Sequence, residues 1–200
     1  MDKVYHFSAP GRTEIGGNHT DHQHGCVIAA AVDMETMAEV TLNGTNIIRV
    51  DSEGYKPVEI DLSDLKIREE EKNTTAALIR GVAAAFAQRG YKLAGFDAKV
   101  KSTVLPGSGL SSSAAFEMGM AVILNTEYGC GLDAPALARI CQFAENAYFG
   151  KPSGLLDQLT SAVGGVLFAD FADPAAPKIE KIHADGVLPE GMTLCVTDTR

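Results

Sequence analysis

The sequence predicts an α+β fold, and three observations support this class. Short apolar segments that alternate with polar residues, or run continuously as in buried strands, dominate residues 4–62. Longer segments with helical periodicity and capping residues dominate residues 73–163. Strands are thus grouped early and helices later, without the regular alternation that builds a doubly wound sheet.

Composition and charge limit what kind of protein this is. Its 200 residues suit one large domain, or one domain and part of another. The net charge of −9, without a basic block, argues against nucleic acid or an anionic membrane as a partner. No segment approaches the ~18 apolar residues that span a bilayer, and no signal peptide is seen, so we expect a cytoplasmic protein. The scattered cysteines are expected to be free thiols in apolar surroundings: Cys26, Cys130, Cys141 and Cys195.

The first part of the chain contains the predicted strands 4–9, 26–32, 36–42, 46–51 and 58–62. The first of these ends at Pro10-Gly11, where a polar, glycine-rich loop begins that extends to Gly25. The third and fourth are expected to form a hairpin around the turn dipeptide Asn43-Gly44.

The remaining chain contains the predicted helices 73–89, 116–124, 133–148 and 155–163. Asn73 and Asp133 are the expected N-caps, and Gly90 is expected to end the first helix. Further strands are predicted over residues 96–104, 165–171, 178–183 and 192–197.

A glycine- and serine-rich turn joins the strand at 96–104 to the helix that follows it. The turn has the sequence Leu105-Pro106-Gly107-Ser108-Gly109-Leu110-Ser111-Ser112-Ser113. Unpaired backbone N–H groups and the helix dipole at such a helix N-terminus suit a phosphate group. The glycines allow close backbone approach, and the serines offer hydroxyls to a phosphate oxygen or a metal ion. Simple helix capping would explain the same turn.

The polar loop after the first strand is a second candidate site. Asn18, His19 and Asp21 could form hydrogen bonds with neighbouring hydroxyls of a sugar, although a solvated turn would use the same residue types. His22 and His24, with His19, also suggest a metal site. No second cluster of Cys or His completes one, so a sugar or a turn is favoured.

Two carboxylates in the helical region complete the candidates. Glu145 is a lone helical glutamate, which is most often exposed. Asp157 lies among Leu155, Leu156 and Leu159, where a charge is costly without a partner. The helix dipole could favour it in a first turn. We expect an arginine from the early loop as its partner and a substrate hydroxyl as its neighbour.

Three of these segments together resemble galactokinases and the wider family of GHMP small-molecule kinases. Pro10-Gly11-Arg12 followed by Gly17-Asn18-His19-Thr20-Asp21 resembles the N-terminal signature of galactokinases. The segment 106–114 resembles the phosphate-binding motif of GHMP kinases. Glu145 and the segment 150–158 are similar to the galactokinase segment that carries the catalytic aspartate. Three motifs in the same order are far more specific than one glycine-rich turn.

The resemblance implies a fold and a domain organisation. The fold would be that of a ribosomal protein S5 domain 2-like N-terminal domain, a mixed sheet with helices packed on one side. Residues 1–185 would form this ATP- and sugar-binding domain, and residues 186–200 would begin a truncated C-terminal GHMP domain. We expect the missing C-terminal domain to be a partner of this one, and the chain alone to be inactive or nearly so.

The resemblance also implies an ATP-dependent sugar kinase, namely a galactokinase that converts galactose to galactose 1-phosphate at the anomeric hydroxyl. Asp157 would accept or orient the proton of that hydroxyl, and Arg12 would steady Asp157 and the charge on the transferred group. The sugar would be bound by Asn18, His19, Asp21 and the backbone of Gly154.

ATP and Mg²⁺ are the implied cofactors. The ATP phosphates would be held by Pro106, Gly107, Ser108, Gly109, Leu110, Ser111, Ser112 and Ser113. Mg²⁺ would be held by Ser113 (or Ser112) and Glu145. No G-K-[ST] motif is present, so Mg²⁺, the helix dipole and Arg12 must replace the usual phosphate-binding lysine.

Three positions depart from the galactokinase pattern, which usually has Asn, Glu and Tyr where this chain has Glu14, Asn18 and His22. An amide in place of a carboxylate adds a donor, and this can change the preferred pattern of sugar hydroxyls.

Two other functions could use some of the same residues. A catalytically silent relative could sense sugar and ATP and act through a protein partner, but it need not keep Arg12, Glu145 and Asp157. A serine hydrolase using residues 111–113 would need a G-x-S-x-G elbow and a nearby base, which the sequence does not offer.

Overall fold

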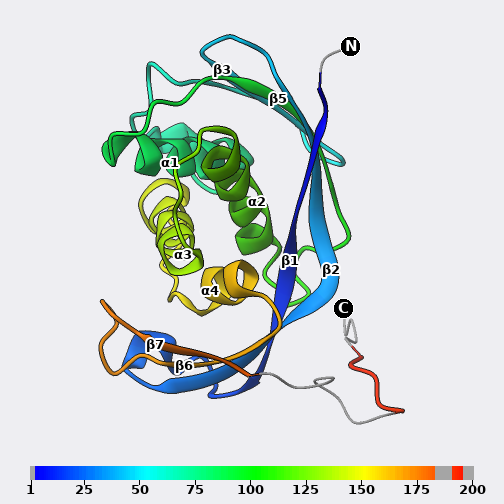
Figure 1. The fold of residues 1–200 in the computed structure, drawn as a ribbon, viewed down its shortest axis with the longest axis vertical. Helices are drawn as coiled ribbons and strands as arrows, with labels where there is room; N and C mark the ends of the chain where they lie inside the picture. Colours follow the sequence, from blue (N-terminus) through cyan, green and yellow to red (C-terminus); the bar gives the residue numbers. More distant parts are fainter. Residues whose placement is uncertain (1–2, 183–190, 196–200) are drawn as a thin grey trace.

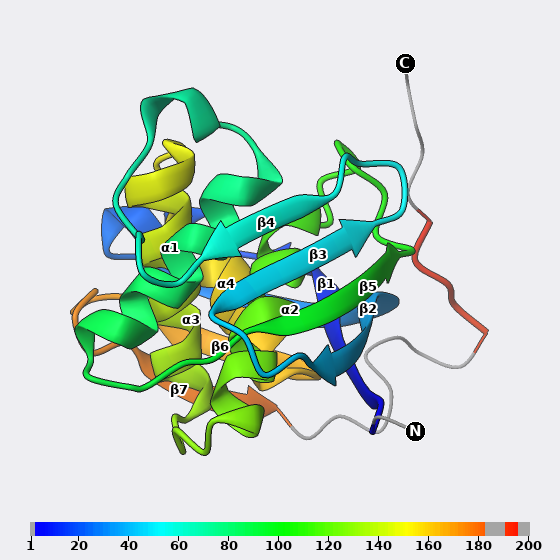
Figure 2. The same cartoon turned by 90° about the horizontal axis from the view of Figure 1, so that it is seen from above.

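The computed structural model describes residues 3–182 and 191–195, in which a seven-stranded sheet curves around four α-helices (Figures 1 and 2). The strands are β1 (Tyr5–Gly16), β2 (Cys26–Leu42), β3 (Ile47–Ser52), β4 (Val58–Asp61), β5 (Phe96–Ser102), β6 (Val166–Asp170) and β7 (Lys178–Ile182). The helices are α1 (Thr75–Gln88), α2 (Ser112–Glu127), α3 (Ala134–Phe143) and α4 (Leu156–Val163), with the π-helix η3 (Ala144–Phe149) and the 3-10 turns η1 (Thr20–Gln23) and η2 (Glu69–Glu71). The helices lie on one face of a mixed sheet, which confirms the expected fold class.

The long strand β2 organises the sheet. β1 runs antiparallel to β2 over most of its length, while β6 pairs with residues 26–30 of β2 and β5 with residues 36–42. The sheet order is β4-β3-β5-β2-β6-β7. The predicted hairpin of residues 36–42 with 46–51 is wrong, because β5 lies between β2 and β3 and pairs parallel with β3. The turn dipeptide Asn43-Gly44 indicates that the chain reverses there, but it cannot show that the distant strand β5 lies between the two strands that it connects.

β1 and β2 are longer than the sequence predicts. β1 continues past Pro10-Gly11 to Gly16, so residues 11–16 of the predicted polar loop are strand. Pro10 is tolerated because β1 pairs only with β2 among the described residues and shifts its register between Pro10 and Arg12. β2 also continues through residues 33–35, where the sequence predicts an interruption.

The predicted helices are all present, with shifted ends. Asp133 caps α3 as predicted, accepting a hydrogen bond from the Ala136 backbone N–H at 2.9 Å. Thr74, not Asn73, is the N-cap of α1, and Gly90 with a φ of +86° follows its end as expected. α2 begins at Ser112, four residues before the predicted start, because the serines form its first turn. No helix among the described residues is long and apolar enough to cross a bilayer.

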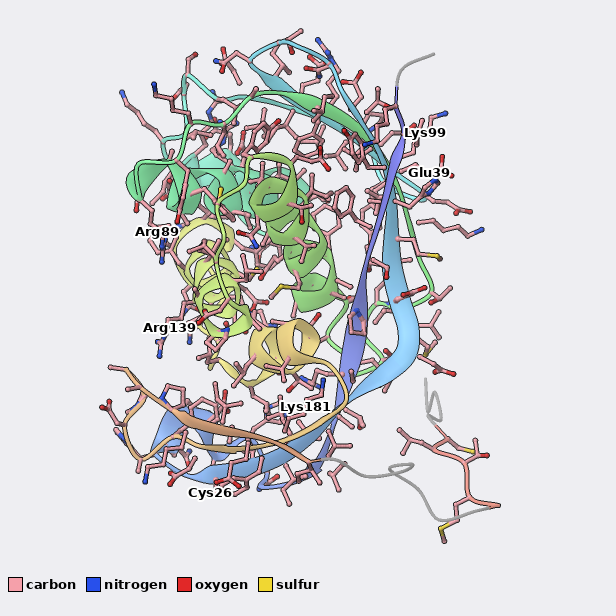
Figure 3. All side chains as sticks on the ribbon, in the orientation of Figure 1. Cys26, Glu39, Arg89, Lys99, Arg139 and Lys181 are labelled. Carbon is pink, nitrogen blue, oxygen red and sulfur yellow. The ribbon has the colours of Figure 1, made fainter. Side chains whose placement is uncertain are left out.

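The last part of the chain and the cysteines bring further corrections. Residues 192–195 form no strand, while 196–197, His183 and the predicted domain boundary at 185/186 lie outside the described residues. All four cysteines are free, as predicted. However, Cys26 at the start of β2 (Figure 3) and Cys195 are exposed, so apolar surroundings are wrong for these two.

The core lies between the helices and the face of the sheet that they cover. α2 lies inside it and is buried on nearly all sides, which is typical of a helix whose sequence is apolar all round. The opposite face of the sheet is polar, and its cross-strand partners Glu39 on β2 and Lys99 on β5 point away from the helices (Figure 3).

A gap in the sheet positions the glycine-rich turn. Between its pairings with β6 and β5, the edge of β2 that faces away from β1 has no strand paired to it at residues 31–35 within the described part of the chain. The turn that leaves β5 fills this gap, and the Thr103 N–H donates to the Glu35 carbonyl at 2.9 Å. A small apolar cluster fixes the turn there: Val104, Leu110 and Ala115 with Val32 and Met34. The turn therefore meets β1 and the start of α4 at the centre of the molecule.

Candidate functional site

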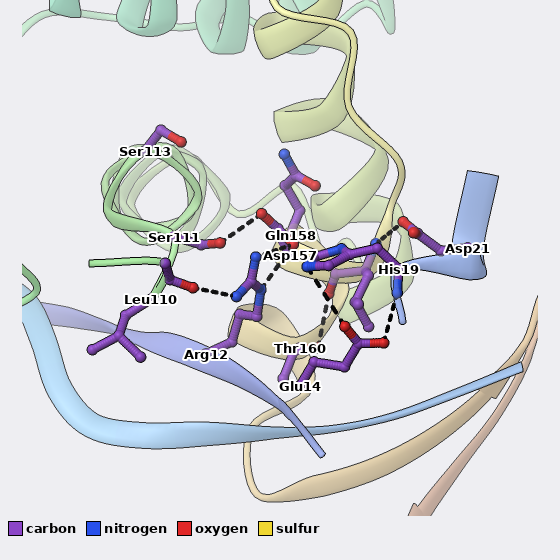
Figure 4. Close-up of polar contacts among 12 residues, drawn as sticks. Arg12, Glu14, His19, Asp21, Leu110, Ser111, Ser113, Asp157, Gln158 and Thr160 are labelled. Atoms are coloured by element: carbon purple, nitrogen blue, oxygen red, sulfur yellow. Dashed lines mark hydrogen bonds and ion pairs between the residues drawn. The ribbon is translucent and has the colours of Figure 1, made fainter. Parts of the chain in front are cut away.

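Arg12 on β1 and Asp157 in the first turn of α4 form a largely buried ion pair (Figure 4). The Arg12 Nη2 and Nε atoms lie 2.7 and 2.8 Å from Asp157 Oδ1, and Nη1 donates to the Gly109 carbonyl at 2.6 Å. The two side chains are only 7% and 18% exposed. The predicted arginine partner of Asp157 is confirmed, although Arg12 belongs to a strand and not to a loop.

The glycine-rich turn contacts the same aspartate. Gly107 and Gly109 have φ values of +76° and +77°, a backbone conformation that favours glycine over residues with a Cβ. Ser111 also has a positive φ, +59°, and its Oγ donates to Asp157 Oδ2 at 2.5 Å. A left-handed conformation of a non-glycine residue costs energy and is concentrated at functional sites. Both carboxylate oxygens of Asp157 are thereby held in place.

Ser113 and Glu145 meet on the other side of α2. The Ser113 Oγ donates to Glu145 Oε1 at 3.0 Å, while Gln158 Nε2 donates to Oε2 at 2.6 Å. Glu145 lies on the π-helix η3 and is fully buried, so the expectation of an exposed glutamate is wrong. π-helical turns often occur at functional sites. Ser112 lines an adjacent cavity, as Ser113 also does.

The oxygens of Ser113 and Glu145 suit a magnesium ion. Among the described residues no group of three or more His, Cys, Asp or Glu could hold a metal ion, and this includes the histidines of the early loop. Mg²⁺ commonly uses one or two carboxylates and completes its shell with water and substrate phosphates. A hydroxyl and a carboxylate beside the glycine-rich turn fit that donor set.

Glu117 on α2 belongs to none of the three sequence motifs and lies near Glu145 and Gln158. It is fully buried on α2, and neither of its carboxyl oxygens has a hydrogen-bond partner among the described residues. Burial, and next the charge of Glu145, raises the pKa of the Glu117 carboxyl well above its ordinary value. Gln158 Oε1 likewise has no hydrogen-bond partner in the part of the chain that the structure describes. The sequence signal was an acidic residue within the apolar run 116–124.

The predicted sugar-binding residues lie beside the ion pair, and two of them brace α4. Asp21 is buried, and its Oδ2 accepts a hydrogen bond from the Leu156 N–H at 3.0 Å. A Cβ on Gly154 would lie 1.8 Å from the same oxygen, so only glycine fits there. The His19 side chain is half exposed, and the His19 backbone N–H donates to Glu14 Oε1 at 2.8 Å (Figure 4). Asn18, which precedes it with a φ of +57°, is exposed.

A cavity of about 420 Å³ opens beside the turn. Pro106, Ser112 and Ser113 line one side of it. Its apolar lining comes from Tyr55, Leu78, Val100, Val104, Phe116 and Phe149. A larger hollow of about 690 Å³, lined by residues such as Phe7 and Met37, contains none of the residues of the site and lies on the sheet. The smaller cavity is therefore the one that continues the site.

Comparison with known proteins agrees with this geometry. A model of the galactokinase galactose-binding signature matches residues 2–42, and a model of the GHMP kinases N terminal domain matches residues 77–165. A galactokinase of Streptomyces coelicolor is 39% identical over 199 residues, which are 97% of this chain and 50% of that protein. A galactokinase of Thermococcus kodakarensis is 36% identical over 82% of this chain and 46% of that protein. The chain spans about half the length of these curated relatives.

Solved structures show the same relationship. Lactococcus lactis galactokinase complexed with galactose superposes with a TM-score of 0.81 and 26% identity, covering 88% of this chain and 47% of that one. Methanococcus jannaschii mevalonate kinase, with a TM-score of 0.72 and 17% identity over 92% of this chain and 56% of that one, shares the fold. The chain therefore belongs to the GHMP kinase family and corresponds to the N-terminal portion of galactokinases.

Proposed function

We propose that the protein containing this chain is a galactokinase, which transfers the γ-phosphoryl group of ATP to the anomeric hydroxyl of galactose. The observation that carries the proposal is the convergence of Arg12, Asp157 and the serine-lined start of α2 at one point. The galactokinase relatives and the galactose-bound neighbour support the same sugar. The rest of the protein is expected to supply the other wall of the cleft.

The proposed reaction is a direct transfer. The sugar oxygen attacks the γ-phosphorus, a new O–P bond forms, the bond from the γ-phosphorus to the β,γ-bridging oxygen breaks, and ADP leaves. Asp157 accepts or orients the hydroxyl proton, which then passes to solvent. Arg12 holds Asp157 in position and offsets negative charge on the transferred group. Positioning and charge stabilisation supply most of the catalysis in such transfers.

The sugar is proposed to lie against the end of β1 and the start of α4. Asn18 and His19 are exposed there and can form hydrogen bonds with its hydroxyls. Asp21 and the Gly154 backbone form the floor, where the Asp21 carboxylate is already fixed by α4. The amide of Asn18 presents a donor and an acceptor to the sugar in place of a carboxylate.

ATP is proposed to bind across the glycine-rich turn. Residues 106–113 hold its phosphates through backbone N–H groups at the start of α2. The 420 Å³ cavity, with the rings of Tyr55, Phe116 and Phe149, is of a size and polarity that suit the adenine base. Ser113 and Glu145 would hold Mg²⁺, which when bound neutralises charge on the phosphate oxygens.

The experiment that tests this function is an ADP-release assay on the complete protein. It uses Mg-ATP with galactose, glucose, arabinose and N-acetylgalactosamine in separate reactions. Turnover that depends on galactose supports the proposal. A preference for another sugar would support a sugar kinase but would replace galactose as its substrate. Absence of turnover with every sugar, together with sugar-dependent thermal stabilisation, would replace it by the silent sensor.

A further inference from the structure

Lys151 lies between η3 and α4, and its side chain folds back onto Glu145. Its Nζ is 3.0 Å from Glu145 Oε1, the same oxygen that accepts the hydrogen bond from Ser113. Its backbone N–H donates to the Glu145 carbonyl at 3.1 Å, which anchors the base of the side chain. Glu145 is fully buried, whereas the Lys151 side chain is 53% exposed. One buried carboxylate oxygen is therefore shared by a hydroxyl of the phosphate-binding turn and a solvent-accessible cation.

Other cations around the site have their own partners. Arg12 is bound to Asp157 and to the Gly109 carbonyl. Lys72, which lies near Gly150, has its Nζ 2.6 Å from a Glu69 oxygen. Lys101, in the lining of the 420 Å³ cavity, is 3.6 Å from Glu53. Among these three lysines, Lys151 is the one whose carboxylate partner, Glu145, also accepts a hydrogen bond from a serine in the first turn of α2.

A divalent cation and the Lys151 ammonium cannot contact Glu145 Oε1 at the same time, as Ser113 and Lys151 do. A metal ion held by Ser113 and Glu145 needs the oxygen that the ammonium contacts, and the two positive charges repel each other. The ammonium sits on a flexible four-carbon stem with three rotatable donors, so it can move while its backbone stays anchored. Phosphate oxygens at the start of α2 would be the nearest new anions.

We propose that Lys151 is a phosphate-binding residue, whose ammonium neutralises Glu145 before the nucleotide binds and contacts the ATP phosphates once a divalent cation occupies Glu145. This inference rests on the proposed kinase function. It supplies, from a position outside the turn, the phosphate-binding lysine that the sequence lacks as a G-K-[ST] motif.

The test compares Lys151→Met and Lys151→Arg with wild type in the complete protein. Removal of the competing charge in Lys151→Met should strengthen Mn²⁺ binding to the nucleotide-free protein, measured from the electron paramagnetic resonance signal of free Mn²⁺. The same variant should bind Mg²⁺ with the β,γ-imido analogue of ATP about tenfold more weakly, as expected when one charge-assisted hydrogen bond is lost. Calorimetry should show unchanged adenosine binding.

The controls separate this role from a structural one. Lys151→Arg keeps the charge and should retain most of the affinity for the analogue. Lys181 lies on β7, and its Nζ donates to the Val163 carbonyl at the end of α4. Lys181→Met should therefore change neither the Mn²⁺ affinity nor the affinity for the analogue. Unchanged Mn²⁺ and analogue affinities in Lys151→Met would overturn the proposal, as would an equal loss for adenosine and the analogue. If wild type binds the analogue but phosphorylates no sugar, the kinase function fails while these binding data still decide the role of Lys151.

Discussion

Asp157 lies among leucines, and two neighbouring side chains and a helix N-terminus offset the cost of burying its charge. Arg12 donates to one carboxylate oxygen and Ser111 to the other, while the first turn of α4 places it at a helix N-terminus. These contacts fix the carboxylate where a substrate hydroxyl would approach. Its need for a cation could be predicted, because an aspartate within an apolar segment is costly alone.

Asp157→Asn keeps the shape of the side chain and removes its basic oxygen. We expect kcat for sugar phosphorylation to fall by about 10²- to 10⁴-fold, the usual contribution of a positioned general base. Nucleotide affinity, measured by calorimetry, should be nearly unchanged. Asp133→Asn is the matched control, because asparagine caps a helix as well as aspartate does. Full activity in Asp157→Asn would remove Asp157 from the mechanism.

Burial of Glu117 predicts how the free energy of unfolding depends on pH. Its folded-state pKa is raised above the ordinary value of 4.5, chiefly by burial, so the folded protein retains a proton that the unfolded chain releases. The free energy of unfolding should therefore fall as pH rises above about 4.5, by up to ~1.4 kcal/mol per pH unit, until the folded-state pKa is reached.

Glu117→Gln removes this titration while keeping a donor. Urea unfolding of wild type and variant from pH 4.5 to 8 should show that the stability of Glu117→Gln relative to wild type increases with pH. A difference that is constant across this range would show that Glu117 is already ionised in the folded protein. Glu127→Gln, at a partly exposed position on the same helix, is the control.

At the scale of elements, the start of α4 depends on one close packing contact. Asp21 in the turn η1 accepts the Leu156 N–H, and Gly154 passes so close to the same carboxylate that no Cβ fits. This contact joins two of the three sequence motifs. The motifs were recognisable in the sequence, but the contact between them was not, since it depends on how η1 and α4 are placed in space.

Gly154→Ala should force Asp21 away and break its hydrogen bond to α4, at a cost of about 1.5–3 kcal/mol in the free energy of unfolding. Chemical denaturation measures this cost. Because the clash involves the Asp21 side chain, Gly154→Ala should cost much less in an Asp21→Ala background. Additive costs in the double variant would contradict this account. Gly119→Ala is the control, because the space around its Cβ is open and alanine favours the helix.

The helices were easier to predict than the sheet. Helical periodicity and caps such as Asp133 and Gly90 are local signals, and the structure keeps them. Pairing of β3 with β5 joins residues almost fifty positions apart, so the signal at Asn43-Gly44 could not reveal it. The full length of β1 could not be predicted, because Pro10-Gly11 is typical of a strand end. In the structure a register shift and pairing with β2 alone accommodate these two residues.

At the scale of the whole molecule, the site lies beside the part of β2 that separates its pairing with β6 from its pairing with β5. The strand β2 pairs with β6 at one end and β5 at the other, and the glycine-rich turn fills the space between them. This arrangement brings together Arg12 and Asp157, which are 145 residues apart in the chain. Residue types and motif order identified the members of the site, whereas the topology of the sheet determines that they meet.

Identification of the phosphorylated product tests the central claim most directly. The complete protein is incubated with Mg-ATP and galactose, and the products are examined by phosphorus NMR with proton correlation. We predict a sugar phosphate whose phosphorus couples to the anomeric proton, with ADP formed in equal amount. A phosphate on another hydroxyl, or ADP and inorganic phosphate without any sugar phosphate, would contradict the account.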